Sequence, residues 1–188
     1  ITKFEVQNTT IQINREAKNK DLHLVFGPED GDAHAGAIGF SDARLLLFPV
    51  KSMKGVFAWV TCPKILKQFK RDMEIISDKA TDKNIELKIP NFDKLGENSC
   101  YSNSKNLTFK DKLALEEYTF DCHKIEDEFT VSGKEFGEWL SENAVNKDSA
   151  WAEKLKTDIV VLSNDDFKDF TELSTEVITR TKIENATG

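Results

Sequence analysis

The sequence predicts an α+β fold, in which short buried strands are combined with amphipathic helices. Two apolar runs, residues 45–50 and 56–60, are short and rich in branched and aromatic side chains, as is typical of buried strands. Residues 63–76 instead place apolar side chains at helical spacing on one face. A third apolar run, within residues 158–163, predicts another fully buried strand, so strands and helices should share a core.

Length and composition indicate a single domain, or one domain with an insertion. The 188 residues are 39% hydrophobic and 31% charged, which is typical of a soluble globular protein. No apolar run approaches the roughly 20 residues that a membrane-spanning helix needs, so we expect no membrane partner. The net charge of −7 argues against a surface that is basic all round, but it permits a local basic patch for nucleic acid.

The three cysteines, Cys62, Cys100 and Cys122, are odd in number and widely spaced. They form neither a disulfide framework nor a CxxC pair, and reduced thiols in a cytoplasmic protein are the simplest explanation. The chain has no initiator Met, and its first residues do not form a signal peptide. We therefore expect it to be part of a longer protein.

A short polar turn, Lys51-Ser52-Met53-Lys54-Gly55, separates the first two predicted strands. Two cations and a hydroxyl lie there beside a glycine that allows a ligand to approach the backbone, so the turn is a candidate phosphate site. The other interpretation is a tight, solvated connection between strands. On residue types alone the second interpretation is favoured, because one such motif is weak.

The helix that follows should begin at Thr61 and Pro63, with Thr61 as its cap. Its polar face could meet RNA or an acidic partner, although an ordinary solvated face is favoured. The basic residues of that face are Lys64, Lys67, Lys70 and Arg71.

Residues 77–111 are polar and predict an inserted segment with one or two edge strands. Residues 113–123 look extended again, and the adjacent Cys122 and His123 lack the partners of a metal site. In the loop 28–36, Asp30, Asp32 and His34 alternate as metal ligands would. A solvated loop is favoured there, because no further ligand lies at a familiar spacing.

Ser132 to Glu135 has the pattern of a capping box, followed by a helix with Trp139 in its apolar face. Asp148 or Ser149 should begin a second short helix, with Trp151, and both tryptophans are interpreted as packing residues rather than base-stacking ones. Asn164 should cap a helix over 165–173. Residues 175–184 then alternate as a strand, which places Arg180 on its charged face, and 185–188 resemble the tip of a hairpin.

Three blocks of the sequence, in this order, carry a resemblance to a known family. They are residues 36–66, residues 134–155 with Glu138-Trp139-Leu140-Ser141-Glu142-Asn143-Ala144, and residues 160–183 with Leu173-Ser174-Thr175-Glu176-Val177 through Arg180. The chain resembles, from about Leu24 to Gly188, the repeated backbone subunit of the type III-B CRISPR effector complex. This is the fourth subunit of the Cmr-type module, in the RAMP superfamily.

The resemblance implies a ferredoxin-like, RRM-related RAMP palm with an inserted segment and a β-hairpin thumb. Residues 1–76 would form part of the palm, 77–111 a polar insertion, 112–174 palm and helical insertion, and 175–188 the first arm of the thumb. The implied partners are CRISPR guide RNA, single-stranded target RNA, copies of the chain in a filament, and other type III-B effector subunits. On this interpretation the RNA-binding candidates are Lys51, Ser52, Lys54, Gly55 and Arg180.

Cleavage of target RNA is implied only for the full-length family, with a divalent metal. The family's catalytic aspartate lies upstream of the residues present here, so no catalytic or metal-binding residue is assigned, and we expect these 188 residues alone to show no ribonuclease activity. The alternative is an RNA-binding scaffold subunit of the same kind of complex that does not cleave. A third possibility, which sets the resemblance aside, is an acidic domain with no nucleic-acid role.

Overall fold

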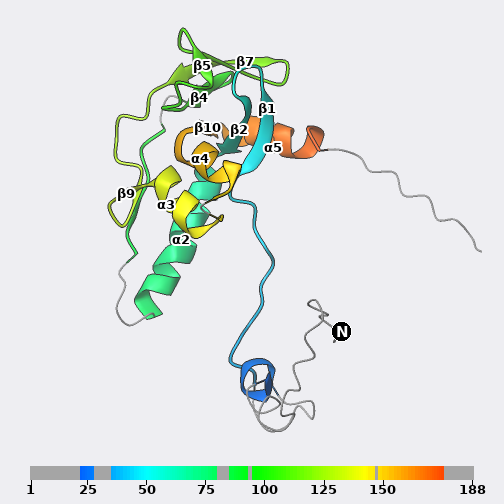
Figure 1. The fold of residues 1–188 in the computed structure, drawn as a ribbon, viewed down its shortest axis with the longest axis vertical. Helices are drawn as coiled ribbons and strands as arrows, with labels where there is room; N and C mark the ends of the chain where they lie inside the picture. Colours follow the sequence, from blue (N-terminus) through cyan, green and yellow to red (C-terminus); the bar gives the residue numbers. More distant parts are fainter. Residues whose placement is uncertain (1–21, 28–34, 80–84, 93–94, 147, 176–188) are drawn as a thin grey trace, which may run out of the picture. The chain divides into compact units, whose positions relative to one another are not determined.

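The computed structural model describes residues 22–27, 35–79, 85–92, 95–146 and 148–175 (Figure 1). The chain divides into two compact units, residues 1–44 and 45–188. Arg180 and the rest of the expected thumb arm beyond residue 175 lie outside the described residues. The same holds for the possible ligands in the loop at 28–34.

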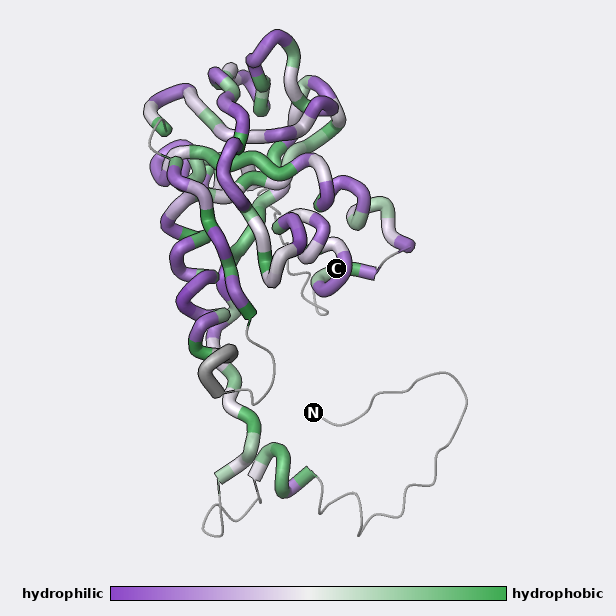
Figure 2. Tube along the Cα trace, turned by 90° about the vertical axis from the view of Figure 1, so that its left-hand side faces the viewer, coloured by the Kyte–Doolittle hydropathy of each residue, from purple (hydrophilic) through white to green (hydrophobic). Residues whose placement is uncertain are grey.

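The first unit contains a short helix over residues 22–26, which ends before Gly27. The chain then returns beside the helix, because the N–H of Ala37 donates to the carbonyl of Leu24 at 3.1 Å. The rings of Phe26 and Phe40 stack with their centroids 6.3 Å apart. Figure 2 shows the helix as largely hydrophobic, although its large apolar side chains are exposed.

The second unit is organised around a seven-stranded mixed sheet with the order β1-β2-β10-β4-β7-β6-β5. One further pair, Ser52 with Leu115, joins β1 to β6, so the sheet curls back onto its first strand. The strands are β1 (Phe48–Ser52), β2 (Val56–Thr61), β4 (Ser99–Tyr101), β5 (Thr108–Phe109), β6 (Lys112–Leu115), β7 (Tyr118–His123) and β10 (Ile159–Leu162).

Strand β10 lies inside the sheet, parallel to β2 and antiparallel to β4, and all four of its residues are buried. Alternate residues of a strand point to opposite faces, so β10 supplies two cores. Val160 and Leu162 belong to the core that includes Phe167 and Phe170 of α5, and Ile159 and Val161 to the other core. The helices are α2 (Pro63–Lys79), α3 (Phe136–Asn143), α4 (Ala150–Thr157) and α5 (Asn164–Leu173).

The second core lies between β10, helices α2 and α3, and a small antiparallel sheet. Leu66 of α2 is fully buried there, as its helical spacing predicted, and Phe69 packs against it. In the part of the chain that the structure describes, no helix is long and apolar enough to cross a membrane. The small sheet consists of β3 (Leu87–Lys88), β8 (Thr130–Val131) and β9 (Lys134–Glu135).

The predicted capping box is wrong. Ser132 and Gly133 have φ of +50° and +80° and form the turn of the β8–β9 hairpin, while α3 begins at Phe136 without a side-chain cap. The cap of α5 is Ser163, one residue before the predicted Asn164, whereas Ser149 caps α4 as predicted. A serine followed three residues later by a glutamate fits a hairpin turn as well as a helix start, so the motif did not decide between them.

Two extended segments also differ from expectation. Within the polar stretch 77–111, β3 is short and lies in the small sheet, but β4 is buried between β10 and β7 rather than at an edge. Residues 113–123 form two strands, β6 and β7, which are joined by a turn at Glu116 with φ of +49°. The main sheet therefore gains a central strand and a hairpin that hydrophobic runs alone do not reveal.

Candidate functional site

The turn between β1 and β2 has an unusual backbone. Gly55 and Val56 have φ of +82° and +72°, in the left-handed region that glycine adopts readily and a β-branched residue rarely does. A Cβ on Gly55 would lie 2.9 Å from Cδ2 of Leu107 and 3.3 Å from the carbonyl oxygen of Asn106. The chain itself therefore requires glycine here, through both its conformation and its close approach to the loop after β4.

Two polar side chains of the turn bind the protein. Ser52 is buried, and its Oγ donates to the carbonyl of Ala114 at 3.1 Å. The exposed Lys54 donates through Nζ to the carbonyls of Lys105 and Thr108, at 2.9 and 2.7 Å. Both side chains therefore attach the turn to neighbouring segments.

Lys51 differs from its neighbours, because it lies on the exposed face of β1. Its carbonyl accepts from the N–H of Glu116 at 2.9 Å, but its ammonium has no partner among the described residues. Both Lys51 and Lys54 are exposed, but of the sequence-predicted candidates that can be placed, Lys51 is the cation whose ammonium the described residues leave unbonded. Helix α2, which carries the basic residues of the predicted polar face, follows directly on β2 at the end of the strand away from the turn (Figure 1).

A buried polar network lies behind the turn, around Asp158. The side chain of Asp158 is only 3% exposed, and its Oδ2 accepts from Nζ of Lys154 at 2.6 Å. Its Oδ1 accepts from Ser104 Oγ at 2.7 Å and from Thr157 Oγ1 at 3.0 Å. Burial raises the pKa of the Asp158 carboxyl, but these hydrogen bonds outweigh it and hold the pKa below its usual range.

Sequence reasoning missed this network. Lys154 and Asp158 are four residues apart at the end of a predicted helix, a spacing that could have indicated their ion pair. Nothing in the sequence indicated Ser104, which is more than fifty residues away. Ser52 could have been placed correctly, because strand alternation puts it on the same face as the buried Val50.

An aromatic group flanks the network. The ring of Phe57 lies 5.3 Å from those of both Trp59 and Trp151, measured between centroids, and the two tryptophans are 5.9 Å apart. Trp139, on α3, packs against Phe69 at 6.3 Å. Trp139 and Trp151 therefore act in packing, as predicted, although Trp151 remains half exposed.

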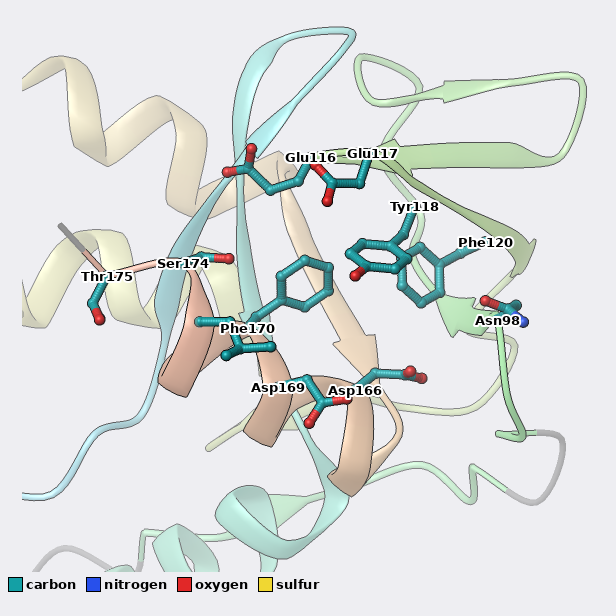
Figure 3. Close-up of a pocket in the computed structure, with 11 residues that line it drawn as sticks. Asn98, Glu116, Glu117, Tyr118, Phe120, Asp166, Asp169, Phe170, Ser174 and Thr175 are labelled. Atoms are coloured by element: carbon teal, nitrogen blue, oxygen red, sulfur yellow. The ribbon is translucent and has the colours of Figure 1, made fainter. Parts of the chain in front are cut away.

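A cavity of about 500 Å³ lies between the β6–β7 turn, β7 and α5 (Figure 3). Tyr118 and Phe170 face each other in its centre, with ring centroids 5.9 Å apart. Because carboxylates repel phosphate, the cavity does not suit a nucleic-acid backbone. Its acidic side chains, Glu116 and Glu117 on one side and Asp166 and Asp169 on the other, border these rings (Figure 3).

The described residues also give no metal centre. Within them, no group of three or more His, Cys, Asp or Glu side chains is arranged to hold a metal ion. The network around Asp158 does not fit a metal ion either, because the Asp158 carboxylate is already paired with the ammonium of Lys154.

No family model matches the chain, but comparison with known proteins finds relatives that are similar to most of it. The chain is 32% identical, over 190 aligned positions, to the CRISPR system Cmr endoribonuclease Cmr4 of Pyrococcus furiosus, covering 97% of this chain and 58% of that protein. The chain thus spans little more than half the length of this curated relative.

Solved structures agree. The crystal structure of oligomeric Cmr4 from Pyrococcus furiosus matches with a TM-score of 0.59 and 34% identity, over 84% of this chain and 54% of that chain. A cryo-EM structure of the type III-B Cmr-beta complex bound to cognate target RNA matches with a TM-score of 0.58, over 92% and 56%. That likeness, at 14% identity, shows the fold alone.

Proposed function

We propose, from the premise that this chain is a homologue of Cmr4-type backbone subunits along nearly its whole length, that it is the guide-RNA-binding backbone subunit of a type III-B CRISPR antiviral complex. Its partners are then guide RNA, single-stranded target RNA, further copies of itself and other type III-B effector subunits. The relative is named an endoribonuclease, and its solved structure is oligomeric, which supports cleavage and self-assembly by the complete protein.

The fold proposed for this role is a ferredoxin-like, RRM-related palm. The hairpin β1–β2 followed directly by α2 supports it, because a strand pair leading into a helix is part of the β-α-β-β-α-β unit. The direct parallel pairing of β10 with β2 departs from that unit, which keeps its parallel strands apart. The thumb assigned to 175–188 remains a proposal, as does the contact of Arg180 with RNA. Cytoplasmic location agrees with the free thiols of Cys100 and Cys122, which lie directly opposite each other on β4 and β7.

The observation that carries the proposal is an exposed lysine on a turn whose other groups are fixed. Lys51 supplies a charge to an RNA phosphate, while the exposed residues Met53 to Gly55 lie beside it. Ser52 and Lys54 contribute by holding the turn in place. The divalent metal that cleavage implies is assigned to none of the described residues, because they do not fit one.

The test is guide-RNA binding by the assembled complex with Lys51→Ala, measured over a series of salt concentrations. We expect a loss of about 1 kcal/mol that does not depend on guide sequence, and a salt slope smaller by about 0.7, the value for one contact to a single strand. Lys124→Ala, an exposed lysine beyond the end of β7, is the matched control. Unchanged affinity for Lys51→Ala at low salt would contradict the proposal.

The same complex distinguishes the two forms of the function. A cleaving complex cuts bound target RNA when divalent metal is added, whereas a scaffold binds guide and target and leaves the target intact. Failure to bind either RNA would favour the third possibility, a domain with no nucleic-acid role.

A further inference from the structure

The β1–β2 turn holds a backbone conformation that its sequence does not favour. Val56 is β-branched, 78% exposed and has φ of +72°, directly after Gly55 at +82°. A β-branched residue in this region is strained and persists only when the surrounding structure imposes it. Since the Val56 side chain is exposed, its own packing does not impose it, and the cause lies in what contacts the backbone.

Two groups make that contact: the N–H of Phe57 donates to the carbonyl of Gly55 at 2.9 Å across Val56 itself, and Lys154 reaches the same carbonyl from α4. Nζ of Lys154 donates to the carbonyl of Gly55, the peptide group that links Gly55 to Val56, at 2.7 Å. The same ammonium lies 4.5 Å from the centroid of the Phe57 ring, immediately after the strained residue. One side chain on α4 therefore fastens the turn at a point 99 residues away in sequence.

Asp158 fixes Lys154 in turn. It lies one turn further along, at the end of α4, and binds the ammonium at 2.6 Å from a nearly inaccessible position. Its other oxygen accepts from Ser104. Close to Ser104 in sequence, the carbonyls of Lys105 and Thr108 accept hydrogen bonds from the ammonium of Lys54. The turn is thus attached twice to one rigid assembly, through Lys54 and through Lys154.

These contacts also argue against direct RNA binding by Lys154. Its side chain is 22% exposed, its charge is balanced by Asp158, and its ammonium already bonds a carboxylate and a carbonyl. An ammonium whose charge is already balanced and whose hydrogen bonds are already made gains little by binding a phosphate.

We propose that Lys154 is a positioning residue for guide-RNA binding, anchored by Asp158, which holds the strained turn so that Lys51 and the adjacent backbone meet the phosphate. The inference rests on the proposed function, since it assigns a purpose to the conformation of that turn. It makes Lys154 act through Lys51 rather than on RNA itself.

The test compares Lys154→Met with Lys51→Ala in the assembled complex. Methionine keeps an apolar stem against Phe57 but removes the ammonium. We expect Lys154→Met to weaken guide binding about fivefold with an unchanged salt slope, whereas Lys51→Ala lowers both the affinity and the slope. Lys154→Arg, which can still donate to Gly55, should restore most of the affinity. The matched control is Lys156→Met, on the same helix, whose exposed pair with Glu153 does not reach the turn.

Hydrogen exchange supplies a measurement that does not depend on RNA. In Lys154→Met, amides of residues 53–57 should exchange at least tenfold faster, while those of α5 exchange as in the parent. If Lys154→Met fails to fold, guide binding and hydrogen exchange are measured on Lys154→Gln instead, because glutamine retains a neutral donor. Its affinity and its exchange rates should lie between those of the parent and those of a complete loss.

The outcomes separate the two proposals. If Lys51→Ala weakens binding but Lys154→Met changes neither affinity nor exchange, the positioning role is overturned and the proposed function stands. A salt slope reduced in Lys154→Met as much as in Lys51→Ala would make Lys154 a direct phosphate contact and also overturn the positioning role. If Lys51→Ala binds like the parent, the proposed RNA contact fails, and the inference fails with it.

Discussion

The β1–β2 turn and the acidic cavity adjoin each other, yet they use their charged groups in opposite ways. A backbone hydrogen bond of 2.9 Å, from Glu116 to Lys51, connects the two regions. In the turn, Lys54 and the nearby Lys154 are bonded to the protein, whereas the ammonium of Lys51 has no partner among the described residues. Around the cavity the carboxylates face open space, apart from Asp166, which accepts from Ser163.

If the chain binds RNA as proposed, this difference restricts where the RNA lies. A phosphate chain that contacts Lys51 meets repulsion from Glu116 and Glu117 on one side, so its path should leave the turn on the side away from the β6–β7 turn. On a chain with a net charge of −7, the proposed function requires local geometry rather than overall charge to decide where RNA binds. The turn is fixed and has one unpaired ammonium, whereas the cavity has several carboxylates that no cation among the described residues pairs with.

The largest expected effect comes from removing the anchor of the turn. Asp158→Ala leaves the Lys154 ammonium and the Ser104 hydroxyl without their buried partner, and we expect the free energy of unfolding to fall by about 3 kcal/mol. Urea denaturation measures it. Asp127→Ala, an exposed carboxylate, is the control and should change stability by less than about 0.5 kcal/mol. Equal losses in both variants would show that the network does not fix the turn.

A second variant tests the close approach of the turn to the loop after β4. Gly55→Ala places a methyl group against Leu107 in a left-handed conformation, and we expect a loss of about 2 kcal/mol. Gly133→Ala is the matched control, because Gly133 has φ of +80° with open space around it and should lose only about 1 kcal/mol, from conformation alone. Thermal unfolding of both variants isolates the contact, and identical midpoints would contradict it.

A third variant tests whether the carboxylates of the β6–β7 turn repel RNA from the β1–β2 turn. Replacing Glu116 and Glu117 together by glutamine should raise guide-RNA affinity about threefold at low salt, and the gain should vanish at high salt. Replacing Glu126 and Asp127 by their amides makes the same charge change beyond the other end of β7 and should have less effect. If both double variants gain equally, net charge alone matters, and the two regions do not differ in the way described.

The smallest expected effect is a loss of folding stability at acid pH. The pKa of Asp158 is held below its usual range in the folded chain, so below about pH 4 the unfolded chain takes up the proton first. The stability that this carboxylate contributes is present above that pH and is lost as the pH falls through the folded pKa. Urea midpoints between pH 7 and pH 3 should therefore fall more steeply for the parent than for Asp158→Asn. If the urea midpoints of the parent and of Asp158→Asn fall in parallel with pH, the lowered pKa of Asp158 is contradicted.

Apolar patterning was sufficient to predict much of this fold. The runs that became β2 and β10, and the periodic face of α2, were placed correctly, and the three-block resemblance is confirmed by the Cmr4 relative. The first strand was predicted at 45–50 but is Phe48–Ser52, so Lys51 and Ser52, which were assigned to the turn, end β1. Strand β4 was misplaced because it is short and followed by the buried serines Ser102 and Ser104, whose burial depends on distant hydrogen-bond partners. Periodicity does not detect a buried polar residue.

The candidate site was predicted less well, for a related reason. The sequence shows which side chains a turn contains but not which of them the protein binds itself. Lys54 resembled a phosphate ligand until its two carbonyl partners, more than fifty residues away, were seen. Its assignment, like that of Lys51, stays a prediction until RNA binding is measured.

The attachments of the β1–β2 turn also determine when it is completed during synthesis. Its partners lie 51 to 99 residues further along the chain, from Lys105 to Lys154. A ribosome that has just released the turn has not yet made the groups that hold it, and Asp158 comes later still. We therefore expect nascent chains to be unable to engage guide RNA through this turn, so that assembly on RNA is restricted to subunits whose second unit has finished folding.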